Sequence, residues 1–255
     1  MSRLPDSQTT SIASSTADDV IVRGKSLCRD LIGKLTFTQM TYFQVTGQMP
    51  TPAQTAVVDA CLVALMEHGL TPSVIAARMV GSSAPEALQA AVAAGILGVG
   101  SVFVGTVEGC AALLHRIVSA EGGMEAEARR IAEEHRAAMT PIPGFGHPVH
   151  KPDDPRPPVI LGVLTTQKVA GKHAAALKAL SAAVDTVYGR HITINATGAI
   201  AAALADVDVP IEIMRGFAVL ARCAGLVGHL YEEKRQPAMR AIQEAAERAV
   251  PYEAR

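Results

Sequence analysis

The chain is poor in aromatic side chains: among its 255 residues there is no tryptophan, and Phe and Tyr together make up 4%. Its hydrophobic residues, 49% of the total, are mostly Ala, Leu, Val and Ile. Small aliphatic residues suit closely packed helices, whereas sheets are enriched in aromatic and β-branched residues. The composition therefore predicts an all-α fold, and the length is sufficient to bury a substantial core.

The sequence also has no large excess of positive or negative charge. The sequence has 23 basic and 24 acidic residues, with a formal net charge of −1. Proteins that gather polyanions carry a broad basic field. We therefore expect no nucleic-acid partner.

Cysteine and histidine show no metal-ligand spacing. The cysteines form no CxxC pair, and no two of the eight histidines are spaced as paired ligands on one helix face. This usage fits buried thiols in a reducing cytoplasm, and it predicts no structural zinc or other metal site.

The first nineteen residues are rich in Ser, Thr and Asp and contain no apolar core of a signal peptide. We expect residues 1–19 to form a disordered leader and residues 20–255 to form a helical domain. Later, residues 87–107 carry no charge, which is near the length of a membrane span. Their glycines would weaken an isolated helix, so we interpret this stretch as a helix buried against another helix or a partner subunit.

Caps and apolar spacing predict ten or so helices joined by short loops. Thr51-Pro52, for example, is typical of a helix start, and Gly69 of a helix end. The expected helical segments are 27–32, 37–43, 51–68, one from 71, one from 85, 125–139, 158–180, 182–188, one after 198, and 210–233.

Residues 141–156 concentrate reactive side chains on backbone that cannot be regular helix or strand. Prolines and glycines hold such a loop in one shape, and functional groups are commonly placed on rigid loops. The alternative, a plain connector whose polar groups are only solvated, stays open.

Four segments in order resemble the citrate synthase superfamily, and specifically its citryl-CoA lyase branch, which includes the C-terminal module of ATP-citrate lyase. They are residues 33–51, 65–73, 144–156 and 222–234. The resemblance implies a multi-helical fold with a large lobe and a small lobe, the small one at about residues 152–205. It also implies a homodimer or higher homo-oligomer that binds an acyl-CoA and a carboxylic acid, with coenzyme A entering as part of the substrate and no tightly bound cofactor.

By the same resemblance, His147 would polarise the oxygen that changes between hydroxyl and carbonyl, and His68 would be a second catalytic residue. Carboxylates would be bound by Arg156 and Arg222, since the guanidinium group donates two parallel hydrogen bonds. Further implied contacts are to the CoA moiety, from Pro143, Gly144, Phe145, Gly146 and Lys151, and to the active site of the other subunit, from Arg235. Simpler roles remain possible: His68 could cap a helix end, Arg222 could pair with a structural Glu, and His150 could be a surface residue.

Two positions depart from the superfamily pattern. Val104 or a neighbour stands where synthases carry a further histidine, which favours the lyase branch. Thr197 stands where an aspartate is typical, and a threonine hydroxyl cannot act unaided as a general base at neutral pH. Thr197 or Asn195 could still orient a water or hold the thioester carbonyl. The proton transfer would then fall to another group, such as His68, Asp153, Asp154 or Glu108.

The sequence thus favours an enzyme that cleaves a 3-hydroxy-3-carboxyacyl-CoA into acetyl-CoA and a 2-oxo acid. Two alternatives stay open because of Thr197. One is a related enzyme acting on a different acyl-CoA, and the other is a CoA-thioester-binding subunit without catalysis.

Overall fold

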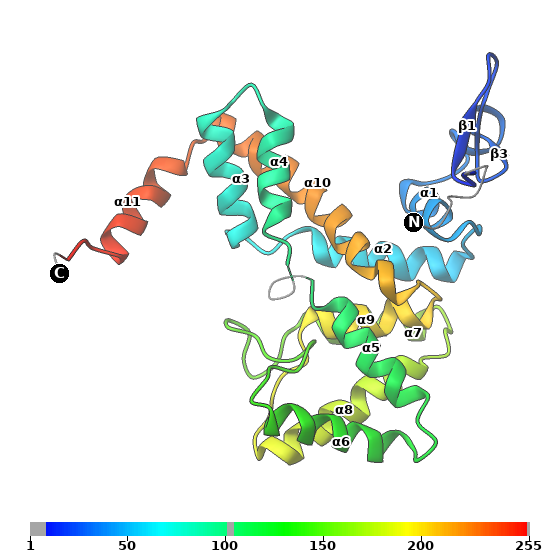
Figure 1. The fold of residues 1–255 in the computed structure, drawn as a ribbon, viewed down its shortest axis with the longest axis vertical. Coiled ribbons are helices and arrows are strands. Elements are labelled where there is room, and N and C mark those ends of the chain that lie inside the picture. Colours follow the sequence, from blue (N-terminus) through cyan, green and yellow to red (C-terminus); the bar gives the residue numbers. More distant parts are fainter. Residues whose placement is uncertain (1–8, 101–104, 254–255) are drawn as a thin grey trace, which may run out of the picture.

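A computed structural model describes residues 9–100 and 105–253, and within them the chain is almost entirely helical (Figure 1). The exception is a small antiparallel sheet near the N-terminus, formed by β1 (Ala13–Ser15), β2 (Val20–Val22) and β3 (Lys25–Ser26). The all-α prediction is confirmed. The predicted leader over residues 1–19 stays a prediction; three of its residues form β1, which pairs with β2, and residues 1–8 lie outside the described residues.

The helices follow the sheet along the chain. They are η1 (Leu27–Leu31), α1 (Phe37–Thr46), α2 (Pro52–Met66), α3 (Pro72–Ser83), α4 (Leu88–Leu97), α5 (Val107–Val118), α6 (Met124–Ala137), α7 (Arg156–Thr166), α8 (Lys172–Tyr188), α9 (Ala196–Asp206), η2 (Ile211–Ile213), α10 (Met214–Arg235) and α11 (Met239–Ala249). The longest described join is the loop between α6 and α7.

The region between residues 156 and 188 differs from the prediction of a helix over 158–180 and a short one over 182–188. The first helix, α7, ends at Thr166, and α8 runs without a break from Lys172. The start of α8 is fixed by Asp206, whose carboxylate accepts hydrogen bonds from the N–H groups of His173 and Ala174. This cap comes from the end of α9, so it leaves no trace in the local sequence of α8.

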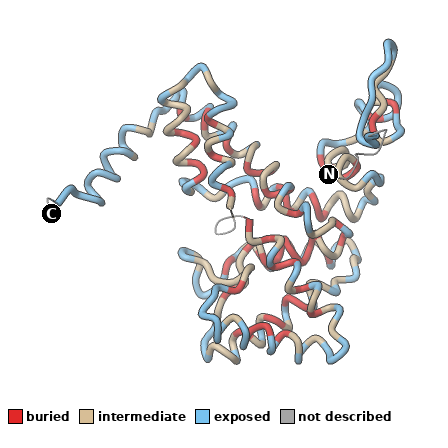
Figure 2. The backbone as a smooth tube through the Cα atoms, viewed as in Figure 1, coloured by how far each residue is buried: buried red, intermediate tan, exposed pale blue. Residues whose placement is uncertain are grey.

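Three clusters of buried side chains organise the fold: a minor one joins the sheet, η1 and α1, and the other two join most of the remaining helices. The larger of these two joins α2, α5 to α9 and the first half of α10, with α9 at its centre, whereas the smaller joins α3, α4 and the second half of α10. Figure 2 shows the buried residues along α9 and α10, and α11 exposed beyond them. The expected small lobe at about 152–205 stays a prediction; its helices share their core with α5 and α6.

The uncharged stretch packs against other helices, as interpreted from the sequence. Within it, α4 contacts α3 and α10 so closely that a Cβ added at Gly95 would lie 2.6 Å from Leu226 Cδ1 and 2.9 Å from the Ser73 carbonyl oxygen. In residues 9–100 and 105–253 no helix combines the length and the apolar character that a bilayer crossing requires.

Candidate active site

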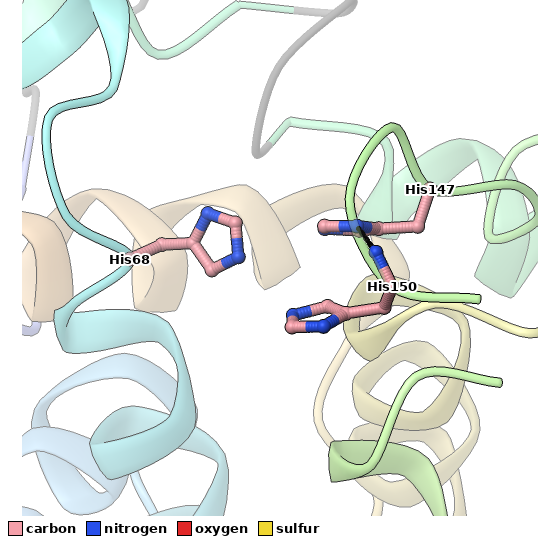
Figure 3. A group of neighbouring side chains, drawn as sticks. All are labelled: His68, His147 and His150. Atoms are coloured by element: carbon pink, nitrogen blue, oxygen red, sulfur yellow. Dashed lines mark hydrogen bonds between the residues drawn. The ribbon is translucent and has the colours of Figure 1, made fainter.

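The turn after α2, the loop between α6 and α7, and helices α9 and α10 bring the predicted reactive side chains together. His68 comes from the turn, and His147 and His150 come from the loop. Figure 3 shows the His68 ring facing the two loop rings across a short gap. The His68 and His147 ring centroids are 5.2 Å apart, and those of His147 and His150 are 4.3 Å apart. The two histidines singled out by resemblance therefore share one site.

Backbone hydrogen bonds fix the protonation of the His147 ring. Its Nδ1 accepts from the N–H groups of Val149 and His150, at 3.1 and 2.9 Å. A ring nitrogen that accepts carries no proton, so the hydrogen of the neutral ring is on Nε2; Arg156 Nη2, 3.4 Å away, is then a second donor beside it and not its hydrogen-bond partner. Burial lowers the pKa of His147, and the nearby His150 and Arg156 lower it further. His147 is therefore a neutral donor at physiological pH.

His68 is also held neutral. Burial lowers the pKa of its imidazole, and the charges of Arg156, His150 and Arg222 lower it further. A neutral imidazole whose pKa lies below 6.5 accepts a proton and releases it again within a narrow free-energy range, as general acid–base catalysis requires. His68 and His147 can thus divide the roles of proton carrier and hydrogen-bond donor.

The buried Asp154 pairs with the half-buried Arg156 at the end of the loop. Arg156 Nε and Nη2 donate to the two carboxylate oxygens of Asp154 at 2.9 and 2.7 Å, and Arg156 Nη2 also lies 3.4 Å from His147 Nε2. Burial alone would raise the pKa of Asp154, but the hydrogen bonds and charge of Arg156 lower it to about 2. Asp154 is consequently a positioning carboxylate and too weak a base to act as the general base.

Arg222 presents a buried charge. It is 3% exposed, and within the described parts of the chain its Nε and Nη1 have no hydrogen-bond partner. Burial lowers the pKa of the guanidinium group, while the charge of Glu67 opposes this; an arginine stays protonated under any physiological condition. Unpaired buried donors are costly, and an anion that accepts from them would remove the cost. Arg222 is therefore suited to bind a carboxylate.

The loop is held by direct contacts with the start of α9. Asn195 N–H donates to the Gly144 carbonyl oxygen at 3.0 Å, Asn195 Nδ2 donates to the Gly146 carbonyl oxygen at 2.9 Å, and Gly146 N–H donates to the Thr193 carbonyl oxygen at 2.8 Å. Phe145 pairs with Ile194 in an isolated β-bridge, and Pro143 packs on Gly109 of α5. These contacts give the loop the single shape that its prolines and glycines predict.

Thr197 lies in the first turn of α9 with its hydroxyl already engaged. It donates to Asn195 Oδ1 at 2.7 Å and lies 2.8 Å from the hydroxyl of Thr106. Since its own hydrogen is given to Asn195, the Thr106 hydroxyl donates in the second contact. The Thr197 hydroxyl is therefore used in structural hydrogen bonds and is not free to act as an acid or a base. Val104, the other departure from the superfamily pattern, lies outside the described residues.

Two further predicted site residues are Arg235 and Lys151. Arg235 is the last residue of α10, thirteen residues or about 20 Å beyond Arg222 along the helix axis, and it contacts Tyr231. Lys151 is exposed on the loop. Their assigned roles, toward the other subunit and toward a phosphate, stay predictions.

The sequence left His150 open, and the structure puts it in the site, half-buried against His147. Its place three residues after His147 in an irregular loop gave no periodicity from which to infer its direction. The facing nitrogens of His68, His147 and His150 lie within 4.8 Å of one another, a spacing that a metal ion could bridge. The adjacent guanidinium groups of Arg156 and Arg222 repel cations, so the site favours an anion.

A cavity of about 500 Å³ opens beside the same loop. Apolar side chains supply most of its walls, with Arg136 at its edge. The lining residues used below are Arg136, Ile142, Phe145, Val184 and Tyr188.

Comparisons with known proteins agree with this geometry. Residues 8–243 match the family model "Citrate synthase, C-terminal domain". The fold is similar to citryl-CoA lyase from Hydrogenobacter thermophilus, with a TM-score of 0.86 and 30% identity over 97% of this chain and 95% of that one. It is also similar to a mutant ATP citrate lyase from Methanosaeta concilii solved in complex with (3S)-citryl-CoA, with a TM-score of 0.79 and 18% identity over 99% of this chain and 42% of that one.

Among curated proteins, the chain is 27% identical over 190 residues to "Putative citrate synthase 2" of Mycobacterium tuberculosis, which covers 73% of this chain and 49% of the relative. The citrate synthase of Synechocystis is 28% identical over 207 residues, covering 78% of this chain and 50% of the relative. The chain thus spans about half the length of the curated relatives it matches.

Proposed function

Because the chain belongs to the citrate synthase family, we propose that it is a lyase of the citryl-CoA type. It would cleave a 3-hydroxy-3-carboxyacyl-CoA into acetyl-CoA and a 2-oxo acid. The observation that carries this proposal is the pairing of two neutral imidazoles, 5.2 Å apart, with a buried guanidinium that lacks a partner in the described chain. The similarity to a citryl-CoA lyase over nearly the whole of both chains supports it.

The site can perform the reaction with its own side chains. Arg222 binds the carboxylate on the carbon that carries the hydroxyl, and His147 Nε2–H donates to the hydroxyl oxygen. His68 accepts the hydroxyl proton as the carbon–oxygen bond becomes a carbonyl. The carbon–carbon bond then breaks, and its electron pair enters the thioester as an enolate.

Proton balance explains how the reaction proceeds without an aspartate at position 197. Cleavage removes one proton from the hydroxyl group, and the enolate carbon needs one proton to become the methyl group of acetyl-CoA. His68 can return the proton it has taken, so no further acid is consumed. Thr197, tied to Asn195, holds the start of α9 in place beside the loop.

Coenzyme A would lie along the loop of Pro143, Gly144, Phe145 and Gly146. The adjoining cavity offers the flat side chains of Phe145 and Tyr188 to a base and the Arg136 guanidinium to a phosphate. Lys151, exposed on the same loop, would supply a second phosphate contact. The four cysteines are unpaired in the described chain, which supports a reducing cytoplasm as the compartment.

The test is to incubate the purified protein with (3S)-citryl-CoA and related hydroxyacyl-CoAs and to follow acetyl-CoA release by mass spectrometry. We expect wild-type protein to release acetyl-CoA, and His147→Ala to lower kcat by about 10² to 10⁴, since it removes the donor to the reacting oxygen. His115→Ala, at an exposed position on α5, is the matched control and should retain wild-type turnover.

Unchanged turnover in His147→Ala would contradict the role given to that residue. Thr197 favours a second candidate, a subunit that binds CoA thioesters without cleaving them. In that case CoA raises Tm, because ligand binds the native state, while no thioester in the series is cleaved.

A further inference from the structure

A second charged cluster lies on the far side of His68 from the other histidines. It joins Glu67 at the end of α2, Arg78 of α3, and His229 and Glu233 of α10. Figure 1 shows α10 passing both the end of α2 and α3. The reaction scheme above uses none of these side chains, although one of them is the immediate neighbour of His68.

Glu67 fixes the backbone that carries His68. Its Oε1 accepts from the N–H groups of His68 and Gly69, at 2.7 and 2.6 Å, and its Oε2 lies 2.8 Å from His229 Nε2. Burial alone would raise the pKa of Glu67, but the hydrogen bond from His229 and those from the two N–H groups lower it. Glu67 is therefore an anion that holds the turn after α2 in one conformation.

His229 has only one arrangement of its ring hydrogen that satisfies its neighbours. Its Nδ1 faces Arg78, 2.8 Å from Nη2 and 3.3 Å from Nε. Because a guanidinium group only donates, Nδ1 accepts and the hydrogen is on Nε2, where it is donated to Glu67. His229 thereby links Arg78 to the Glu67 carboxylate, which lies beside His68.

Arg78 is anchored in turn. It is 3% exposed, and its Nη1 donates to Glu233 Oε2 at 2.7 Å while Nη2 contacts Glu232. The other oxygen of Glu233 accepts from the N–H groups of Ala238 and Met239, at the start of α11. A buried, fully bonded pair of this kind is rigid, and removing either partner would leave an uncompensated charge.

Helix α10 presents both clusters on one face. Arg222, Gly225, His229 and Glu233 are spaced three, four and four residues apart, which places them along one side of a helix. At Gly225 an added Cβ would lie 2.2 Å from the Met66 carbonyl oxygen, so only glycine lets α10 approach the end of α2 this closely. The same contact that brings Arg222 to the site therefore brings His229 to Glu67.

We propose that Glu67, His229 and Arg78 are positioning residues that hold the His68 imidazole opposite His147. None of them touches the substrate in the proposed scheme, on which this inference rests. A displacement of His68 by about 1 Å would lower the rate of proton transfer by about 10²-fold while leaving acyl-CoA binding to the loop and Arg222 unchanged.

Two substitutions of His229 distinguish its contact with Glu67 from its contact with Arg78. In His229→Gln the side-chain amide reaches the place of Nε2 and still donates to Glu67. In His229→Asn the shorter amide reaches only the place of Nδ1 and still accepts from Arg78. We expect His229→Asn to lower kcat by about 10- to 100-fold with KM within about twofold of wild type, and His229→Gln to retain kcat within a few-fold. His115→Asn, at an exposed position on α5, is the control and should match wild type.

Equal kcat in the Asn and Gln variants, with only Tm reduced, would overturn the proposal. A second readout does not need turnover: the pKa and the NMR chemical shifts of the His68 imidazole, assigned with His68→Gln, should change in His229→Asn and return in His229→Gln. If wild-type protein cleaves none of the acyl-CoAs tested, the lyase proposal fails, and the His68 resonances still decide whether the positioning contacts exist.

Discussion

Some side chains in this site lower the stability of the unliganded fold because they are arranged to bind a ligand. Arg222 is the clearest case. A guanidinium group that is 3% exposed and lacks partners for Nε and Nη1 in the described chain costs free energy in the unliganded protein. We predict that Arg222→Met, which fills a similar volume without charge, leaves the free energy of unfolding unchanged or raises it by about 1–3 kcal/mol. The same variant should lose the increase in Tm that citrate gives to wild type.

Urea denaturation with and without citrate measures both effects. Arg240→Met, at an exposed position on α11, controls for the change of side chain. A loss of several kcal/mol in Arg222→Met would instead indicate that the guanidinium has a structural partner, the simpler role that the sequence alone left open.

The Asp154 carboxylate has the opposite effect on stability. Its folded pKa, about 2, is below the ordinary value of 3.8, so the folded state binds its proton less readily than the unfolded state. The stabilisation is present above pH 3.8 and is lost as the pH falls toward 2, and it amounts to about 2 kcal/mol. We predict that Asp154→Asn is less stable by about this amount at pH 7 and that the difference narrows between pH 4 and pH 3. Chemical denaturation at each pH checks this, and a difference that does not depend on pH would contradict it.

Site residues could be predicted where a sequence pattern implied their role. They could not be predicted where only tertiary contacts bring a side chain to the site. His68, His147, Arg156 and Arg222 were assigned from the resemblance, and the hydrogen bonds and ring distances bring the first three together. His150 could not be assigned, because nothing local sets the direction of a side chain in an irregular loop. The contact between His229 and Glu67, the residue before His68, joins positions 162 residues apart, which no local pattern reveals.

At the scale of elements, the loop between α6 and α7 depends on two glycines for different reasons. Both have positive φ, +89° at Gly144 and +77° at Gly146, but a Cβ at Gly144 would lie 2.6 Å from Cys110 Sγ and 2.9 Å from Gly198 Cα, whereas Gly146 has open space. We predict that Gly146→Ala costs about 1–2 kcal/mol from backbone strain alone and that Gly144→Ala costs about 1–3 kcal/mol more, because the loop must also move away from α5 and α9. Thermal denaturation of the two variants isolates the steric part.

Gly162→Ala in α7, where nothing lies within 4 Å, should be neutral or slightly stabilising. Equal losses for Gly144→Ala and Gly146→Ala would mean that the loop does not press on α5 and α9 as described.

Most helix positions were predictable from caps and periodicity, but α5 and α11 were not predicted as separate helices, and helix boundaries were less predictable. The start of α2 at Pro52 follows from Thr51, which forms a capping box with Gln54. The break between α7 and α8 did not follow from its own sequence, since alanine-rich segments continue a helix readily and the cap on α8 comes from Asp206. Local caps thus set the starts of α1, α2 and α9, while a tertiary contact sets this one.

The whole molecule leaves apolar surface that a single chain does not cover. Helix α11 has no buried residue, and Met239, Ile242, Ala245 and Ala249 follow one side of it at helical spacing. An isolated helix of eleven residues is marginal in water, so α11 needs a surface to pack on. Together with the resemblance, this supports the proposed homodimer, in which the end of α10 and α11 reach a second copy.

Arg235 gives this arrangement a functional test, because it lies about 20 Å along α10 from Arg222 and can serve a site only in another subunit if the helix stays straight. We predict that Arg235→Ala and His147→Ala are each nearly inactive alone and that mixing them, after reversible dissociation, recovers activity. In a mixed dimer one site combines an intact His147 with an intact Arg235 from the other copy, so random pairing of equal amounts should recover about a quarter of wild-type turnover. Light scattering must first give a mass of about twice 26.6 kDa for the wild type. Failure to recover activity from a mixture shown to contain mixed dimers would place Arg235 in the site of its own chain or in no site, and would remove the second subunit from the reaction.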